Sequence, residues 1–392
     1  MDRLRSVWFE SRHLDAGAPA LRAELAALGS DACESVLAVG DRLAAVSLTL
    51  AQQYCRRAPA AWQLGEDFFR RWVAHGETLA TVEPASREAA AAYFAVDVES
   101  LAALPAGDLD AWIALACRVL GASRRLGELF VAGSGSVLSE LGDRRRRLDA
   151  WVDVGLTLAG AGAWESELLA LHFFESTALA LPLFAPTHYA RWAELGRVGA
   201  RLGPSRPELF TSVPTALHAL TEDERGVAVD VALAAADAPA VAIELYFSLP
   251  AVLDAAAEER DAVVASLLPV AQAMPRALTE LLPVLRVLLE RIPAASRGAL
   301  VGLAGMIAAR FPAGVVPYYR VLPRLLEQTG VAGVTRWVEE GLVVAADAVE
   351  AGRAYFALDS RTSRAVLAAS STAVPFTEVQ GLLKRYLHML SG

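Results

Sequence analysis

The sequence predicts an all-α fold, an α-solenoid of about eight stacked helix-turn-helix repeats of roughly 36–37 residues. Aromatic residues recur at that spacing, and within segments the apolar residues return every three or four positions, as on one helix face. No sustained alternation of apolar and polar residues indicates a half-buried strand. Since one helix pair cannot bury its own apolar face, neighbouring pairs must cover it.

One aromatic anchor marks each repeat. Successive anchors lie 36, 44, 36, 36, 73 and 37 residues apart, and the gap of 73 equals two periods. The segment Leu278–Leu289 fills that gap with a leucine at the anchor position, which gives eight units. We expect each anchor to sit on the first helix of its unit and to fill the space between consecutive pairs. The anchors are Phe94, Phe130, Phe174, Phe210, Tyr246, Leu282, Tyr319 and Phe356.

A second apolar marker follows each anchor, usually 18 residues later, and should lie on the second helix of the unit. Between the two helices the chain is polar or turn-like, as at 105–108, 142–147, 185–187, 221–226, 257–260 and 329–333. The second markers are Trp112, Trp192, Ala228, Val264, Leu300, Trp337 and Val374, with Trp151 placed 21 residues after its anchor.

Prolines recur four residues after an anchor, at Pro214, Pro250 and Pro323. Proline within a helix loses a backbone hydrogen bond and clashes with the preceding turn, so a helix should bend or restart there, as armadillo- and HEAT-type helices often do. As the first residue of a helix, proline is harmless. Both interpretations stay open, and in both the prolines serve geometry.

The ends of the chain depart from the period. Residues 1–90 predict an N-terminal helical cap or divergent repeats, residues 91–375 the repeat array, and residues 376–392 a C-terminal capping helix with one apolar stripe. Three scattered cysteines and an N-terminus without an apolar leader predict a soluble, cytoplasmic protein.

The chemistry-bearing residues follow no catalytic pattern. The six histidines and three cysteines do not have metal-ligand spacing, and the glycine-rich stretches do not continue into phosphate-binding loops. A net charge of −9 argues against a nucleic-acid-binding protein. We therefore expect no enzyme activity and no catalytic, cofactor-binding or metal-binding residues.

Residues 350–392 carry the most particular pattern, in which Gly352, Tyr355, Phe356, Ser360 and Ser363 precede the helical stretch "VQGLLKRYLHMLSG". This grouping resembles the end of the helical N-terminal region of NorD- and CbbO-type von Willebrand factor A proteins. The resemblance implies an adaptor that works with a MoxR-type AAA+ ATPase to remodel or activate a target complex. The family's metal site is not carried over, because "DSRTS" at 359–363 has the wrong spacing for it.

The sequence thus predicts a non-enzymatic scaffold that binds other proteins, possible partners being an AAA+ ATPase and a von Willebrand factor A protein. The alternative is a helical-repeat nucleic-acid-binding protein or a glycosylase-like enzyme, which would need a basic groove with stacking aromatics. Exposed arginines are the candidate partner-binding residues because they could pair with an acidic partner. They are Arg144, Arg145, Arg146, Arg147, Arg353, Arg361 and Arg364.

Overall fold

The computed structural model describes residues 23–357, except residues 26, 82, 84, 161–163 and 204–207. Within these ranges every regular element is a helix and no strand occurs. This confirms the predicted all-α helical-repeat fold. The chain divides into two compact units, the first reaching Gly196 and including 204–212, the second comprising 197–203 and the residues from Val213 onward.

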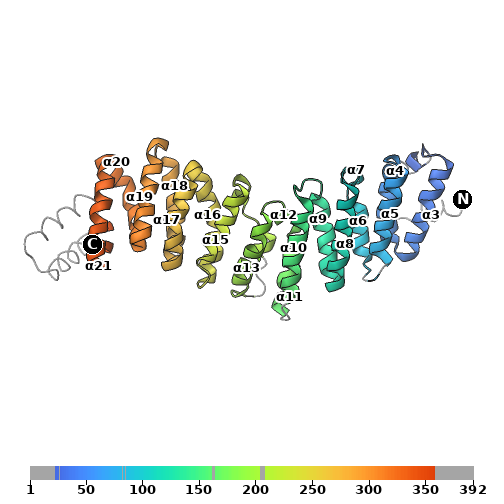
Figure 1. Cartoon of the computed structure of the whole chain (residues 1–392), viewed down its shortest axis with the longest axis horizontal. Helices are drawn as coiled ribbons and strands as arrows, with labels where there is room; N and C mark the ends of the chain where they lie inside the picture. Colours follow the sequence, from blue (N-terminus) through green and yellow to red (C-terminus); the bar gives the residue numbers. More distant parts are fainter. Residues whose placement is uncertain are drawn as a thin grey trace, which may run out of the picture. The chain divides into compact units, whose positions relative to one another are not determined.

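In the first unit, first helices pack on first helices and second helices on second helices along the chain, as α6 does on α9 and α8 on α10 (Figure 1). In chain order the units are α4–α5, α6–α8 with the short α7 between them, α9–α10, and α11–α13 with α12 and the 3₁₀ turn η1 in the connection. The second helix of one unit also packs on the first helix of the next, as in α5–α6, α8–α9 and α10–α11. The elements are α3 (Ser30–Val46), α4 (Leu48–Gln63), α5 (Glu66–Thr81), α6 (Arg87–Ala95), α7 (Val98–Ala102), α8 (Ala106–Ala122), α9 (Arg124–Val137), α10 (Arg144–Ala159), α11 (Trp164–Glu175), α12 (Thr177–Ala180), η1 (Pro186–His188), α13 (Tyr189–Ala200) and α14 (Glu208–Thr211).

The second unit continues the same order with the units α16–α17 and α18–α19, followed by the two halves of α20. Here too the second helix of one unit packs on the first helix of the next, as in α17–α18 and α19–α20. First helices contact first helices, as α16 does α18, and second helices contact second helices, as α17 does α19. The elements are η2 (Thr215–Ala219), α15 (Glu222–Leu233), α16 (Pro239–Ala256), η3 (Ala257–Glu259), α17 (Arg260–Ala273), α18 (Pro275–Arg291), α19 (Ala294–Arg310), η4 (Pro312–Gly314), α20 (Val315–Asp347) and α21 (Val349–Phe356).

The predicted anchors form the core. All eight are at most 1% exposed, and those from Phe94 to Tyr319 lie on the first helix of their predicted unit. Phe356 lies on α21, the last helix of the described residues. The tryptophans predicted on the second helices are fully buried as well. One marker is wrong by one residue, because Val263 is fully buried, whereas Val264, the predicted marker on α17, is only half-buried. Val374 lies outside the described residues.

The helix breaks fall where the polar stretches predict them. Thr221 accepts from the backbone N–H of Glu224, whose carboxylate accepts from the N–H of Thr221, so this capping box starts α15. Within α20, Gly330 has φ 63° and divides the helix into two members of a pair. Such a left-handed φ favours glycine.

A glycine four residues after a tryptophan makes room for the next anchor, in a W-x-x-x-G pattern on α5, α10, α13 and the second half of α20. Gly196 is typical, because a Cβ there would lie 1.9 Å from the Cζ atom of Phe210. The ring of Phe210 packs edge-on against Trp192, with 4.7 Å between ring centroids. The tryptophan and the glycine thus form a socket for the anchor ring. The four motifs are Trp72/Gly76, Trp151/Gly155, Trp192/Gly196 and Trp337/Gly341.

The repeat period also appears in polar contacts between successive pairs of the first unit. Each contact joins residues 35 apart on neighbouring second helices. In every pair at least one of the two side chains is largely exposed, so each contact contributes little to stability. Their common spacing shows that the stacking register is constant. The pairs are Arg42–Glu77, His75–Asp110 and Arg118–Asp153.

The described part of residues 1–90, predicted as a cap or as divergent repeats, contains α3, α4 and α5. Tyr54 of α4 stacks on Trp72 of α5 with 5.4 Å between ring centroids, and its hydroxyl donates to the carbonyl of Val36. Tyr318 of α20 donates in the same way to the carbonyl of Leu300, also 18 residues earlier. The capping helix predicted at 376–392 lies outside the described residues.

The recurrent prolines occupy two kinds of position. Pro250 and Pro323 lie inside α16 and α20, as the bend interpretation allows, whereas Pro214 precedes η2 after α14 has ended at Thr211. Proline is therefore compatible with these first helices, at the cost of one backbone hydrogen bond each.

One stretch, Pro239–Ala273, is long and apolar enough to cross a membrane by length and composition. It consists of α16, η3 and α17, and Ala257 between them has φ 53°, which interrupts the helical backbone. Tyr246, Leu249 and Leu267 within it are fully buried. A core helix of a soluble protein passes the same test, so this is weak evidence for a span.

Candidate protein-binding site

Two of the candidate arginines face the protein itself. Arg144 donates from Nε to the carbonyl of Leu138 at 2.7 Å and from Nη2 to the carbonyl of Ser139 at 3.0 Å. Arg147 donates from Nη1 to the carbonyl of Phe184 at 2.7 Å. Arg144 thus satisfies the carbonyl at the end of α9, and Arg147 a carbonyl in the turn between α12 and η1.

The other candidates stay at the surface. Arg145 and Arg146 are exposed at the start of α10, and Arg146 lies 3.9 Å from the carboxylate of Asp143. Arg353 on α21 pairs with Glu350 at 3.3 Å. The structure therefore does not gather the candidate arginines into one patch within a helix pair. Arg361 and Arg364 lie outside the described residues.

An arginine at the start of the second helix recurs as a structural element. Arg225 and Arg260 donate from Nε to the carbonyls of Leu217 and Leu253, at 2.7 and 2.9 Å. Arg260 also binds the carboxylate of Glu224 at 2.8 Å. Burial opposes ionisation of Glu224, but its hydrogen bonds to Thr221 and Arg260 outweigh that effect and lower its pKa.

His75 on α5 is a partly buried ionisable side chain whose two ring nitrogens have different surroundings. Its Nε2 atom lies 3.0 Å from Asp110, whereas its Nδ1 atom is buried without a hydrogen-bond partner. Burial lowers the pKa of His75, and the carboxylate of Asp110 opposes that shift. Among the described residues no group of three or more His, Cys, Asp or Glu side chains could hold a metal ion.

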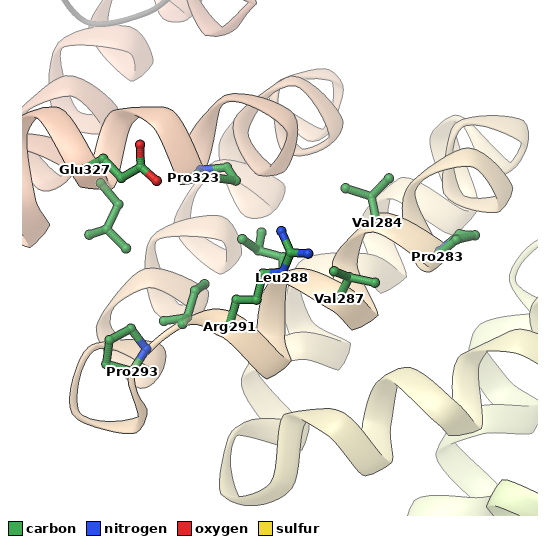
Figure 2. A pocket seen from close by; sticks show the side chains of 10 residues that line it. Pro283, Val284, Val287, Leu288, Arg291, Pro293, Pro323 and Glu327 are labelled. Carbon is green, nitrogen blue, oxygen red and sulfur yellow. The ribbon is translucent and has the colours of Figure 1, made fainter.

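The second unit carries an apolar groove of about 600 Å³ between α18 and the first half of α20 (Figure 2). Leu288 and Ile292 form its floor and are almost fully buried. Val284 and Val287 on its wall remain 45% and 43% exposed. The groove is lined by Pro283, Val284, Val287, Leu288, Arg291, Ile292, Pro293, Pro323, Leu326 and Glu327.

The stacking register builds this groove. Arg320 binds Glu280 at 2.7 Å near the starts of α20 and α18, which shows an offset of 40 residues between the two helices. The same offset relates Pro283 to Pro323 on the two walls. The helices therefore run in the same direction, and the stripe of α18 lies opposite that of α20.

Charged groups border the apolar floor on both sides. Arg291 ends α18 and Glu327 lies on α20, and both side chains line the groove (Figure 2). No ion pair within 4.0 Å joins either to another described residue. A ligand that fills the groove therefore meets apolar side chains in the middle, a cation on one wall and an anion on the other.

Sequence reasoning missed this site because its residues resemble ordinary helix-face residues. The stretch "LLPVLRVLLERIP" predicts an amphipathic helix, and Val284 and Val287 fall on the side opposite its buried leucines. Two valines one turn apart on that exposed side were the available signal.

No protein-family model, no curated protein and no solved structure matches the chain.

Proposed function

We propose that this protein is a non-enzymatic scaffold that binds another protein through the face formed by its first helices. The observation that carries the proposal is the open apolar groove between α18 and α20, with Val284 and Val287 exposed inside it. Contiguous exposed apolar side chains rimmed by polar ones are typical of protein-binding surfaces. Stacked helix pairs supply such surfaces without moving parts.

The resemblance of residues 350–392 to NorD- and CbbO-type proteins indicates which partners to test first. They are a MoxR-type AAA+ ATPase and a von Willebrand factor A protein, both met in the cytoplasm. In this role the chain is an adaptor that holds the ATPase near the complex to be remodelled. The anion and the cation on the groove walls, Glu327 and Arg291, would select the partner by charge complementarity.

Co-expression with each candidate tests the proposal, with the complex measured by size-exclusion chromatography and light scattering. We expect a complex of defined stoichiometry with at least one of them. Failure to form a complex with any protein, together with salt-sensitive binding to DNA, would replace the scaffold by the nucleic-acid-binding alternative.

A further inference from the structure

We propose that the groove between α18 and α20 binds an amphipathic helix of the partner, about three turns long. Its apolar stripe fills the groove, and it presents an acidic residue to Arg291 and a basic residue to Glu327. This inference rests on the proposed scaffold function and specifies the chemistry of the partner.

The groove suits a helix better than an extended peptide. A peptide that adds a strand needs an exposed sheet edge, and the described residues contain no strand. A polyproline segment docks between aromatic side chains, and the lining here has none. A helix satisfies its own backbone hydrogen bonds and needs only pockets for its side chains.

The spacing of the lining residues sets the length of the helix. On α18 and its C-cap residue they recur at three and four positions from Pro283 to Ile292, which makes one continuous stripe about 14 Å long. Pro323, Leu326 and Glu327 repeat the pattern on α20. Two stripes side by side form a seam that receives a third stripe with residues at i, i+3, i+4 and i+7, hence about three turns.

The charges add direction and selectivity. Because Arg291 and Glu327 stand on opposite walls, the bound helix carries opposite charges on the two flanks of its apolar stripe. Opposite charges across an interface raise the association rate and exclude partners of the wrong sign.

A designed peptide tests the proposal on the full chain. The probe is an alanine-based helix of about 18 residues, long enough to be helical in water, with leucine at i, i+3, i+4 and i+7, glutamate on one flank and lysine on the other. Fluorescence anisotropy of the labelled peptide should show saturable binding to the wild type. Val287→Glu should weaken it at least about tenfold, and so should leucine-to-serine changes in the peptide.

Matched controls separate the groove from general effects. Val343→Glu introduces the same charge at an exposed apolar site on the second half of α20, away from the groove, and should leave the affinity unchanged. Should Val287→Glu disturb folding by circular dichroism, Val284→Glu replaces it. Arg291→Glu should shift the preference to a peptide with lysine on both flanks.

The outcomes are distinct. Absence of saturable binding, or equal affinity for the wild type and Val287→Glu, overturns the helix proposal. A dimer of this chain that Val287→Glu dissociates overturns it too, because a second copy then occupies the groove. If a protein partner binds but the peptide does not, the scaffold function stands and the helix fails. If the peptide binds and no protein does, the scaffold function fails.

Discussion

The substitution Gly155→Ala tests whether the tryptophan–glycine socket positions the next anchor. A Cβ at residue 155 would lie 2.3 Å from Cζ of Phe174, whereas ordinary contacts begin near 3.4 Å. The ring must therefore move by about 1.1 Å. Overpacking of this kind costs about 1–3 kcal/mol, and the helix propensity of alanine returns about 1 kcal/mol. We expect a net loss of about 1 kcal/mol of unfolding free energy.

Urea unfolding followed by tryptophan fluorescence measures this change. Gly302→Ala is the control for propensity alone, because no atom lies within 4 Å of the added Cβ on α19, and it should stabilise by about 0.5–1 kcal/mol. In a Phe174→Leu background the penalty at Gly155 should shrink, with a coupling energy of about 0.5–3 kcal/mol. A Gly155→Ala variant as stable as Gly302→Ala would refute the socket.

Three further changes follow from the buried polar contacts. Ser134→Ala should destabilise by about 1–3 kcal/mol in urea unfolding, because the Nε1–H of Trp112 donates to that hydroxyl at 2.8 Å in the core; an unchanged midpoint would contradict this. Arg260→Lys should lower the melting temperature, because lysine cannot bind the carbonyl and the carboxylate together, and an equal melting temperature would count against this role. Burial lowers the pKa of folded His75 below 6.5, so the unfolded chain takes up its proton first as the pH falls. Stability should therefore drop below about pH 6.5, and His75→Gln should remove that part of the slope in urea titrations across pH, whereas the exposed His218→Gln should not.

The fold could be predicted from the sequence because the packing between successive repeats requires a large buried residue at a regular spacing along the chain. Each anchor ring must fill the same space between two pairs, so Phe94 and Phe356 occupy equivalent positions at opposite ends of the predicted array. Residues 1–90 follow the period poorly because Cys55 stands where other units carry an aromatic ring, while Tyr54 beside it fills the core.

The site was harder to predict because it depends on contacts between units. The sequence around Arg144 is equally compatible with an exposed side chain and with one that caps a helix. Only the distance from its Nε atom to the carbonyl of Leu138 distinguishes the two roles. The groove exists because α18 and α20 pack on each other at a particular offset, which the Glu280–Arg320 contact marks and which no local pattern encodes. Sequence periodicity thus predicts which residues are buried, and the structure adds which exposed ones share a surface.

Hydrogen–deuterium exchange on the chain, with and without the designed leucine-bearing peptide, tests most directly whether the groove between α18 and α20 binds a helix. The account predicts slower exchange on binding at Pro283–Pro293 and at Pro323–Glu327, with little change in α19 or in the second half of α20. Slower exchange confined to other helices, with these two segments unchanged, would contradict a binding surface on the first helices.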